Sequence, residues 1–147
     1  MAHRFPNVLI HCVFSTKGRC DLIPPELLPK LFKYFAGIGR NHGIPVLTSG
    51  GTPNHSHLLI VLPPDVSVAK TIQVLKAHSS RWLREQGLDF AWQEGYGAFS
   101  VSASGKDAVT RYIEHQAEHH RQRSFEGEFE TIVRKSGMAF DVNEAFG

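Results

Sequence analysis

The stretch IPVLTSGGTPNHSHLLIVLPP, residues 44–64, contains two apolar runs separated by a turn. Residues 44–50 and 55–62 are rich in β-branched and aliphatic side chains, which favours strands. The cluster GGTPN between them consists of residue types that turns require. Since this connection is short enough for a hairpin, the two strands are predicted to pair antiparallel. Pro63 and Pro64 close the second strand.

Further apolar patterns on both sides of this hairpin complete the expected fold. They are a strand over 7–15, a helix opened by Pro24 and Pro25 that runs to about Asn41, a helix from the N-cap Ser67 to about Gln86, a strand over 90–103, a helix from the cap Ser104 to about Arg123, and a short helix over 126–135. The order β-α-β-β-α-β-α predicts an α+β, ferredoxin-like (RRM-like) fold: a four-stranded antiparallel sheet, two helices on one face and a C-terminal helix that carries Tyr112. The other sheet face is expected to be free for a ligand or partner.

Length and composition support one globular domain. The chain has 147 residues, of which 41% are hydrophobic and 20% are charged, as in ordinary folded domains. We expect residues 1–147 to form a single domain, with 125–147 as a C-terminal tail that is a candidate dimer contact. The apolar run VLIHCVF is too short to span a membrane and is unlike a secretory signal, which predicts a cytoplasmic protein with no membrane partner. Cys12 in this run is expected to be a buried apolar side chain.

Net charge alone does not indicate a nucleic-acid partner. It is only +2, but basic residues predominate early and acidic residues gather late. This distribution is compatible either with binding to a polyanion or with an ordinary solvated surface. The candidate phosphate contacts for DNA are Lys17, Arg19, Lys76 and Arg81, and the candidate base-stacking residues are Trp82 and Phe99. Solvated charge and core packing remain open alternatives for these side chains.

Two histidines stand at the start of the strand predicted over 55–62. Because side chains alternate along a strand, His55 and His57 share a face. Their Cβ atoms should lie about 6.5–7 Å apart, which allows two imidazoles to converge on one cation. The motif therefore predicts a metal site, and the alternative is a pair of partly exposed histidines beside a turn.

A second group lies on the helix predicted after Ser104. Tyr112 and Gln116 are four residues apart and share a helical face. A phenol with a pKa of about 10 is a poor nucleophile until a metal polarises the phosphate that it attacks. The amide oxygen of Gln116, added to two imidazoles, suits Mg²⁺ or Mn²⁺ holding phosphate oxygens. The alternative for Tyr112 is a packed aromatic side chain.

Together these stretches resemble a known family. TPNHSHLLIVLPP resembles the His-hydrophobe-His motif of the single-tyrosine HUH transposases, the IS200-like enzymes of the smallest bacterial insertion sequences. WQEGYGAFSVSASGKDAVTRYIEHQAEHHRQRSF resembles the family's nucleophile segment, and VLIHCVFSTKGR resembles its first strand and basic turn. The resemblance covers residues 7–137. It implies that Tyr112 is the nucleophile and that His55, His57 and Gln116 hold a divalent metal, Mg²⁺ or Mn²⁺.

The resemblance also implies a reaction and a partner. Tyr112 would attack single-stranded DNA at the ends of its element, form a 5′-phosphotyrosine and free a 3′-OH. A second transesterification would rejoin the strands without ATP. The family recognises DNA hairpins and acts as a homodimer in which each tyrosine reaches the histidines of the other subunit.

Two positions depart from the family pattern. Ser56 stands where an apolar residue is usual, with its side chain expected to point away from the metal, and Asn54 stands where Asp is common. Neither change removes a ligand or the nucleophile. Three alternatives remain open: an inactive relative that binds nucleic-acid hairpins without cleavage, a metal-dependent hydrolase that uses water, and a zinc site that adds His115, His119 and His120.

Overall fold

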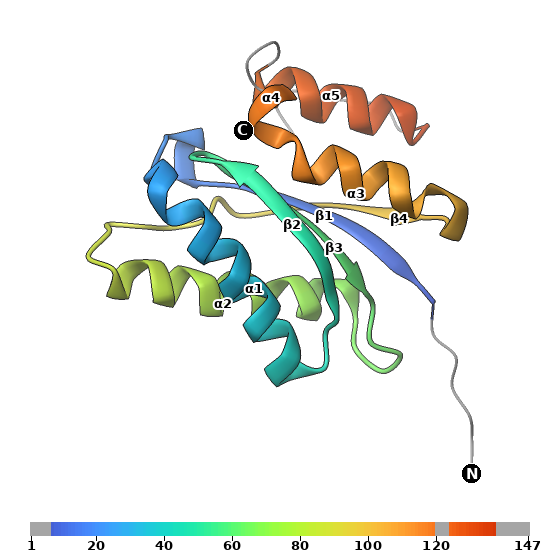
Figure 1. Ribbon diagram of the computed structural model, residues 1–147, viewed down its shortest axis with the longest axis horizontal. Coiled ribbons are helices and arrows are strands. Elements are labelled where there is room, and N and C mark those ends of the chain that lie inside the picture. The colour runs from blue at the N-terminus through green and yellow to red at the C-terminus, as the bar shows by residue number, and fades with distance from the viewer. Residues whose placement is uncertain (1–6, 120–123, 138–147) are drawn as a thin grey trace. The chain divides into compact units, whose positions relative to one another are not determined.

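The computed structural model describes residues 7–119 and 124–137 of the chain (Figure 1). In chain order the elements are β1 (Leu9–Ser15), the 3-10 turns η1 (Lys17–Arg19) and η2 (Pro25–Leu27), α1 (Leu28–His42), β2 (Val46–Thr52), β3 (His55–Val61), α2 (Val68–Glu85), β4 (Gly97–Val101), the 3-10 turn η3 (Ala103–Gly105), α3 (Lys106–Glu114), α4 (Gln116–His119) and α5 (Phe125–Lys135). By compactness the chain divides into two units, Met1–Gln116 and Ala117–Gly147. The first unit contains the whole sheet.

The four strands form one antiparallel sheet in the order β2-β3-β1-β4. β1 is central and pairs with β3 on one side and with β4 on the other. β2 and β3 form the hairpin that the sequence predicts, with Thr52 opposite His55 next to the turn. The predicted α+β, ferredoxin-like order of strands and helices is therefore confirmed.

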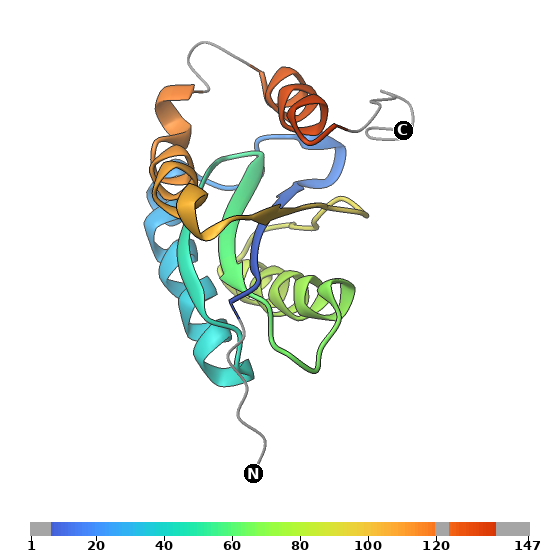
Figure 2. The same ribbon diagram turned by 90° about the vertical axis from the view of Figure 1, so that its right-hand side faces the viewer.

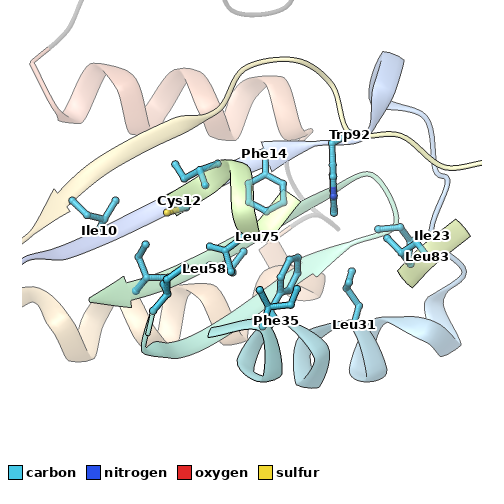
Figure 3. Packing of buried hydrophobic residues seen from close by; sticks show 14 of the residues in the cluster. Ile10, Cys12, Phe14, Ile23, Leu31, Phe35, Leu58, Leu75, Leu83 and Trp92 are labelled. Atoms are coloured by element: carbon cyan, nitrogen blue, oxygen red, sulfur yellow. The ribbon is translucent and has the colours of Figure 1, made fainter. Parts of the chain in front are cut away.

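One face of the sheet forms the main core with α1 and α2. Figure 3 shows Phe14 of β1, Phe35 of α1 and Leu75 of α2 in this layer, together with Trp92. Cys12 is also part of it, and burial raises the pKa of its thiol to about 12. A thiol that stays protonated at neutral pH behaves as a small apolar side chain, as the sequence predicts.

Two helix ends follow signals that the sequence carries. Gly43 ends α1 with a φ of 69°, a left-handed conformation that glycine adopts without steric cost. Ser67 caps α2, because its hydroxyl accepts a hydrogen bond from the backbone N–H of Lys70 at 3.0 Å. Both positions agree with the predicted helix boundaries.

The strand predicted over residues 90–103 is shorter than expected. It is confined to β4, and Gly95 just before it has a φ of 88°. Phe90 and Trp92 are buried in the core, where their rings meet edge-on with centroids 4.7 Å apart. Their aromatic character, which favoured a strand, reflects core packing instead.

The helix predicted over residues 104–123 is interrupted. Ser102, and not Ser104, is the cap, because its hydroxyl accepts a backbone N–H at the end of η3. His115, with φ −107° and ψ 28°, separates α3 from α4. Residues 120–123 lie outside the part that the structure describes. The short helix predicted over 126–135 corresponds to α5.

The second face of the sheet is covered, contrary to the expectation of a free face. α3 lies beside β2 (Figures 1 and 2), and Ile113 of α3 packs against Leu9 and Leu59 in a second apolar cluster. This helix therefore brings its polar residues onto the face that carries His55 and His57. Among the described helices, none has the length and apolar character needed to cross a bilayer.

Candidate active site

The two histidines of β3 lie side by side on the face that α3 covers. Both His55 and His57 have no exposed surface, and their ring centroids are 5.1 Å apart. The expected shared face is confirmed, and the alternative of two partly exposed histidines is wrong. Two buried imidazoles at this separation need polar partners, because burial without hydrogen bonds is costly.

Asn54 places an acceptor oxygen against one ring nitrogen of His55. The side-chain Nδ2 of Asn54 donates to the carbonyl oxygen of Arg19 at 3.4 Å, which turns Oδ1 toward the imidazole. Oδ1 lies 2.7 Å from Nδ1 of His55, so this nitrogen carries the hydrogen and donates. Thr52 adds a polar contact of 2.9 Å to the same nitrogen. In the neutral ring with the hydrogen on Nδ1, the other nitrogen, Nε2, carries a lone pair.

Gln116 directs an oxygen at that lone pair. Its Oε1 lies 3.0 Å from Nε2 of His55. The amide is oriented by its Nε2, which donates to the carbonyl oxygen of Tyr112 at 3.3 Å. With the hydrogen of His55 on Nδ1, these two atoms are both acceptors, and such a pair favours a cation between them. An imidazole nitrogen and an amide oxygen are both suitable metal ligands.

His57 is held by a residue that sequence reasoning did not assign to the site. Nε2 of His11, in β1, lies 2.8 Å from Nδ1 of His57. The two rings are stacked, with centroids 5.0 Å apart. A histidine inside an apolar strand was a visible signal, but only the register between β1 and β3 shows that it reaches His57.

Tyr112 packs its ring edge-on against these histidines. The centroid of its ring lies 5.8 Å from that of His57 and 6.3 Å from that of His11. It stands in the last turns of α3, just before Gln116. One chain therefore brings together the predicted nucleophile and all three predicted ligands.

A glycine allows α3 to approach the sheet so closely. Gly50 lies opposite His57 in the β2–β3 pairing. A Cβ atom at Gly50 would lie 2.0 Å from the carbonyl oxygen of Ile113, a distance that real side chains do not tolerate. In sequence, Ile113 lies between Tyr112, which is also in α3, and Gln116, which begins α4. Gly50 therefore sets the depth at which both reach the histidines.

The donor set fits a divalent metal ion. His55 and His57 would supply two neutral imidazole nitrogens, and Gln116 would supply an amide oxygen. These three leave coordination positions for phosphate oxygens, which suits Mn²⁺ or Mg²⁺. His11 and Asn54 contact the outer nitrogens of the two histidines, as is usual for metal-binding histidines.

The four basic candidates for DNA contact fall in two places. Lys17 and Arg19 form the turn η1, which adjoins the histidine motif through the carbonyl of Arg19. On α2, Nζ of Lys76 donates to two carbonyls of the 93–95 segment at 2.7 and 2.9 Å, and burial lowers the pKa of Lys76. Arg81 is exposed and lies 3.4 Å from a carboxylate on the next helical turn. Contact of these residues with DNA stays a prediction.

The two aromatic candidates also differ in place. Trp82 stacks on Tyr34 with centroids 4.9 Å apart, within the helical layer of the core. Phe99 lies on the site face, with its ring centroid 6.2 Å from that of His11. Of the two, Phe99 is the one near the predicted chemistry.

The structure also shows where Ser56, which departs from the family pattern, and His115 of the alternative zinc site lie. Ser56 is opposite the core residue Phe14 in the β1–β3 pairing, so alternation along β3 places its side chain on the face away from the two histidines. Its buried hydroxyl has no hydrogen-bond partner among the described residues. His115 is exposed, with Nδ1 2.6 Å from a carbonyl of its own helix. His120 and the side chain of His119 lie outside the described part, so the zinc set stays an alternative that the structure does not test.

Comparison with known proteins identifies the family. The family described as Transposase IS200 like matches residues 4–116. The chain belongs to the IS200-like transposase family. The ISDra2 transposase TnpA of Deinococcus radiodurans is 26% identical over 115 residues, covering 72% of this chain and 81% of the relative. The transposase for insertion sequence element IS200 of Salmonella typhimurium is 28% identical over 128 residues, covering 80% and 82%.

Solved structures show the same fold. A protein of Deinococcus radiodurans assigned as a transposase superposes with a TM-score of 0.61 at 20% identity, over 79% of this chain and 96% of that one. A REP-associated tyrosine transposase, solved with a REP hairpin bound, superposes with a TM-score of 0.56 at 14% identity, over 77% and 69%. Family membership makes this IS200-like protein a transposase, an enzyme class that cleaves and rejoins DNA.

Proposed function

We propose that the protein is a metal-dependent transposase that nicks and rejoins single-stranded DNA at insertion-sequence ends in the cytoplasm. The observation that carries the proposal is the position of the Tyr112 ring, 5.8 Å from that of His57. Gln116, in the next turn, reaches His55. A nucleophile beside three metal ligands suits metal-assisted phosphoryl transfer to a tyrosine.

Tyr112 would act by covalent catalysis. Its phenolic oxygen attacks the scissile phosphorus, and the bond from phosphorus to the 3′ oxygen breaks. The phenolic proton passes to solvent, and the leaving oxygen takes up a proton as a 3′-OH. A divalent ion held by His55, His57 and Gln116 would polarise the phosphate and stabilise its charge. Attack by a 3′-OH on the 5′-phosphotyrosine then rejoins DNA and releases Tyr112, with no ATP.

We propose DNA hairpins as the recognised substrate shape. The similar REP-associated transposase is bound to a REP hairpin, and the present chain shares its fold. Lys17 and Arg19, beside the histidine motif, are the proposed phosphate contacts near the scissile bond, and Lys76 and Arg81 are proposed for more distant DNA. An inactive, hairpin-binding relative is the alternative, but the complete set of nucleophile and ligands supports an active enzyme.

A doubly labelled oligonucleotide tests the reaction. Hairpin-bearing single strands from the DNA flanking the gene are incubated with the protein and Mn²⁺. We expect the 3′-terminal label to join the protein in an adduct that survives denaturing gels, and the 5′-terminal label to end in a free 3′-OH. Neither product should form with EDTA or with the duplex. Free fragments without an adduct would instead indicate a hydrolase, and hairpin binding without cleavage would indicate an inactive relative.

We also propose a homodimer with shared active sites. Exchange of an identical element between subunits preserves its contacts. The segment from α3 to Gln116 of either subunit can therefore make the contacts of Tyr112 and Gln116 described above. Mixing Tyr112→Phe with His57→Ala subunits should then restore about a quarter of wild-type activity, because half of the dimers would have one intact site of two. No recovery, with dimers formed, would mean that each chain builds its own site.

A further inference from the structure

His11 lies beneath the proposed metal site in the middle of the sheet. It is 6% exposed, and β1, which carries it, is hydrogen-bonded on both sides. In the pairing of β1 with β3, His11 is opposite Leu59 and His57 is opposite Val13. His11 and His57 are therefore diagonal neighbours on one face. Both imidazoles are carried by directly paired strands, so the sheet fixes the distance between their backbones.

The contact between the two histidines needs a hydrogen on one of the two facing ring nitrogens. Nε2 of His11 and Nδ1 of His57 are 2.8 Å apart, so one nitrogen donates and the other accepts. Either His57 is the Nδ1–H tautomer and His11 accepts, or His11 donates from Nε2. In the second case the remaining nitrogen of His57, Nε2, would carry a hydrogen and could not bind a cation.

We propose that His11 is a positioning residue that holds His57 as the Nδ1–H tautomer and so presents the Nε2 lone pair to the metal. This rests on the metal site of the proposed function. His11 acts through His57 and contacts neither metal nor phosphate. His11 would accept a hydrogen bond from Nδ1 of His57. Asn54 has the same role for His55, because its Oδ1 lies 2.7 Å from Nδ1 of that ring.

The surroundings of His11 orient its ring for this role. The ring is stacked on His57 with an interplanar angle of 29°. Phe99 lies against it at a tilt, and Tyr112 meets it edge-on at 6.3 Å between centroids. These contacts restrict rotation about the side-chain torsions. The same ring therefore lies against both His57 and the proposed nucleophile.

The tautomer can be measured directly in metal-free protein. Long-range ¹H–¹⁵N spectra distinguish the two neutral forms of an imidazole. We expect wild-type His57 to be the Nδ1–H form and His11 to be an acceptor at Nε2. A wild-type His57 that carries its hydrogen on Nε2 would overturn the proposal. Because the spectra are recorded on wild-type protein, the test does not depend on the folding of any variant.

Two substitutions of His11 distinguish the effect of its hydrogen-bond acceptor from the effect of its aromatic ring. His11→Phe keeps an aromatic ring but removes the acceptor, whereas His11→Gln places an amide oxygen near the position of Nε2. With Mn²⁺ alone as the probe, His11→Phe should weaken binding about 10–100-fold. His11→Gln should recover most of the affinity. His42→Phe, which removes an exposed histidine at the end of α1, should bind like wild type.

The outcomes distinguish this role from packing and from the wider proposal. Equal Mn²⁺ affinity in wild type and His11→Phe, or equal loss in His11→Phe and His11→Gln, would mean that the acceptor at residue 11 does not matter. Thermal unfolding of each variant reports its packing effect separately. Because neither readout contains DNA, failure of the proposed DNA cleavage would leave the His11 result intact, and the reverse also holds.

Discussion

Tyr112→Phe should abolish the covalent protein–DNA adduct and reduce strand cleavage by at least about 10⁴-fold, the scale on which loss of a nucleophile acts. The substitution removes one oxygen and keeps the ring that packs against His57 and His11. Folding, Mn²⁺ binding and hairpin binding should therefore stay close to wild type. The measurement is single-turnover cleavage of the labelled hairpin strand.

Tyr96→Phe is the matched control for this result. Tyr96 is 44% exposed and lies in the segment just before β4, so removal of its oxygen should leave cleavage unchanged. Were Tyr112→Phe to keep cutting, giving a free 5′-phosphate and no adduct, water would be the nucleophile. The ligand set would then belong to a hydrolase, and the transposition chemistry proposed for Tyr112 would be wrong.

The fold could be predicted where local chemistry decides it. The hairpin, the cap at Ser67 and the end of the first helix near Asn41 depend on nearby residues, and all three agree with the structure. The prediction was wrong where distant packing decides. Phe90 and Trp92 occupy the core instead of extending the strand. The second face of the sheet is covered by α3, and no local sequence pattern predicts that α3 packs there.

The candidate site divides in the same way. Alternation along β3 is local, so the shared face of His55 and His57 followed from the motif. The four-residue spacing predicted that Tyr112 and Gln116 share a helical face. In the structure α3 ends before Gln116, and a hydrogen bond from the Gln116 side chain to the carbonyl oxygen of Tyr112 links the two residues instead. His11 needed the strand register, which the sequence alone does not specify.

The close approach of α3 to β2 gives the second large effect, in Gly50→Ala. The new methyl group would lie 2.0 Å from the carbonyl oxygen and 2.9 Å from the carbonyl carbon of Ile113. These are backbone atoms that cannot rotate away, so α3 must shift outward. We expect a loss of about 1–3 kcal/mol in the free energy of unfolding, the usual cost of overpacking. Chemical denaturation measures it.

The same shift should separate the two halves of the proposed site. Gln116 and Tyr112 follow Ile113 outward, whereas the histidines of β3 stay in place, so Gly50→Ala should bind Mn²⁺ more weakly and cleave DNA slowly even at temperatures where it is folded. Gly37→Ala is the control: its new methyl lies 3.7 Å from Arg40, and alanine in a helix stabilises by about 0.5–1 kcal/mol. The clash at Gly50 arises whether its own subunit or another supplies α3. A Gly50→Ala protein with wild-type stability and cleavage would therefore show that no α3 helix occupies this face, which would remove Tyr112 and Gln116 from the site together.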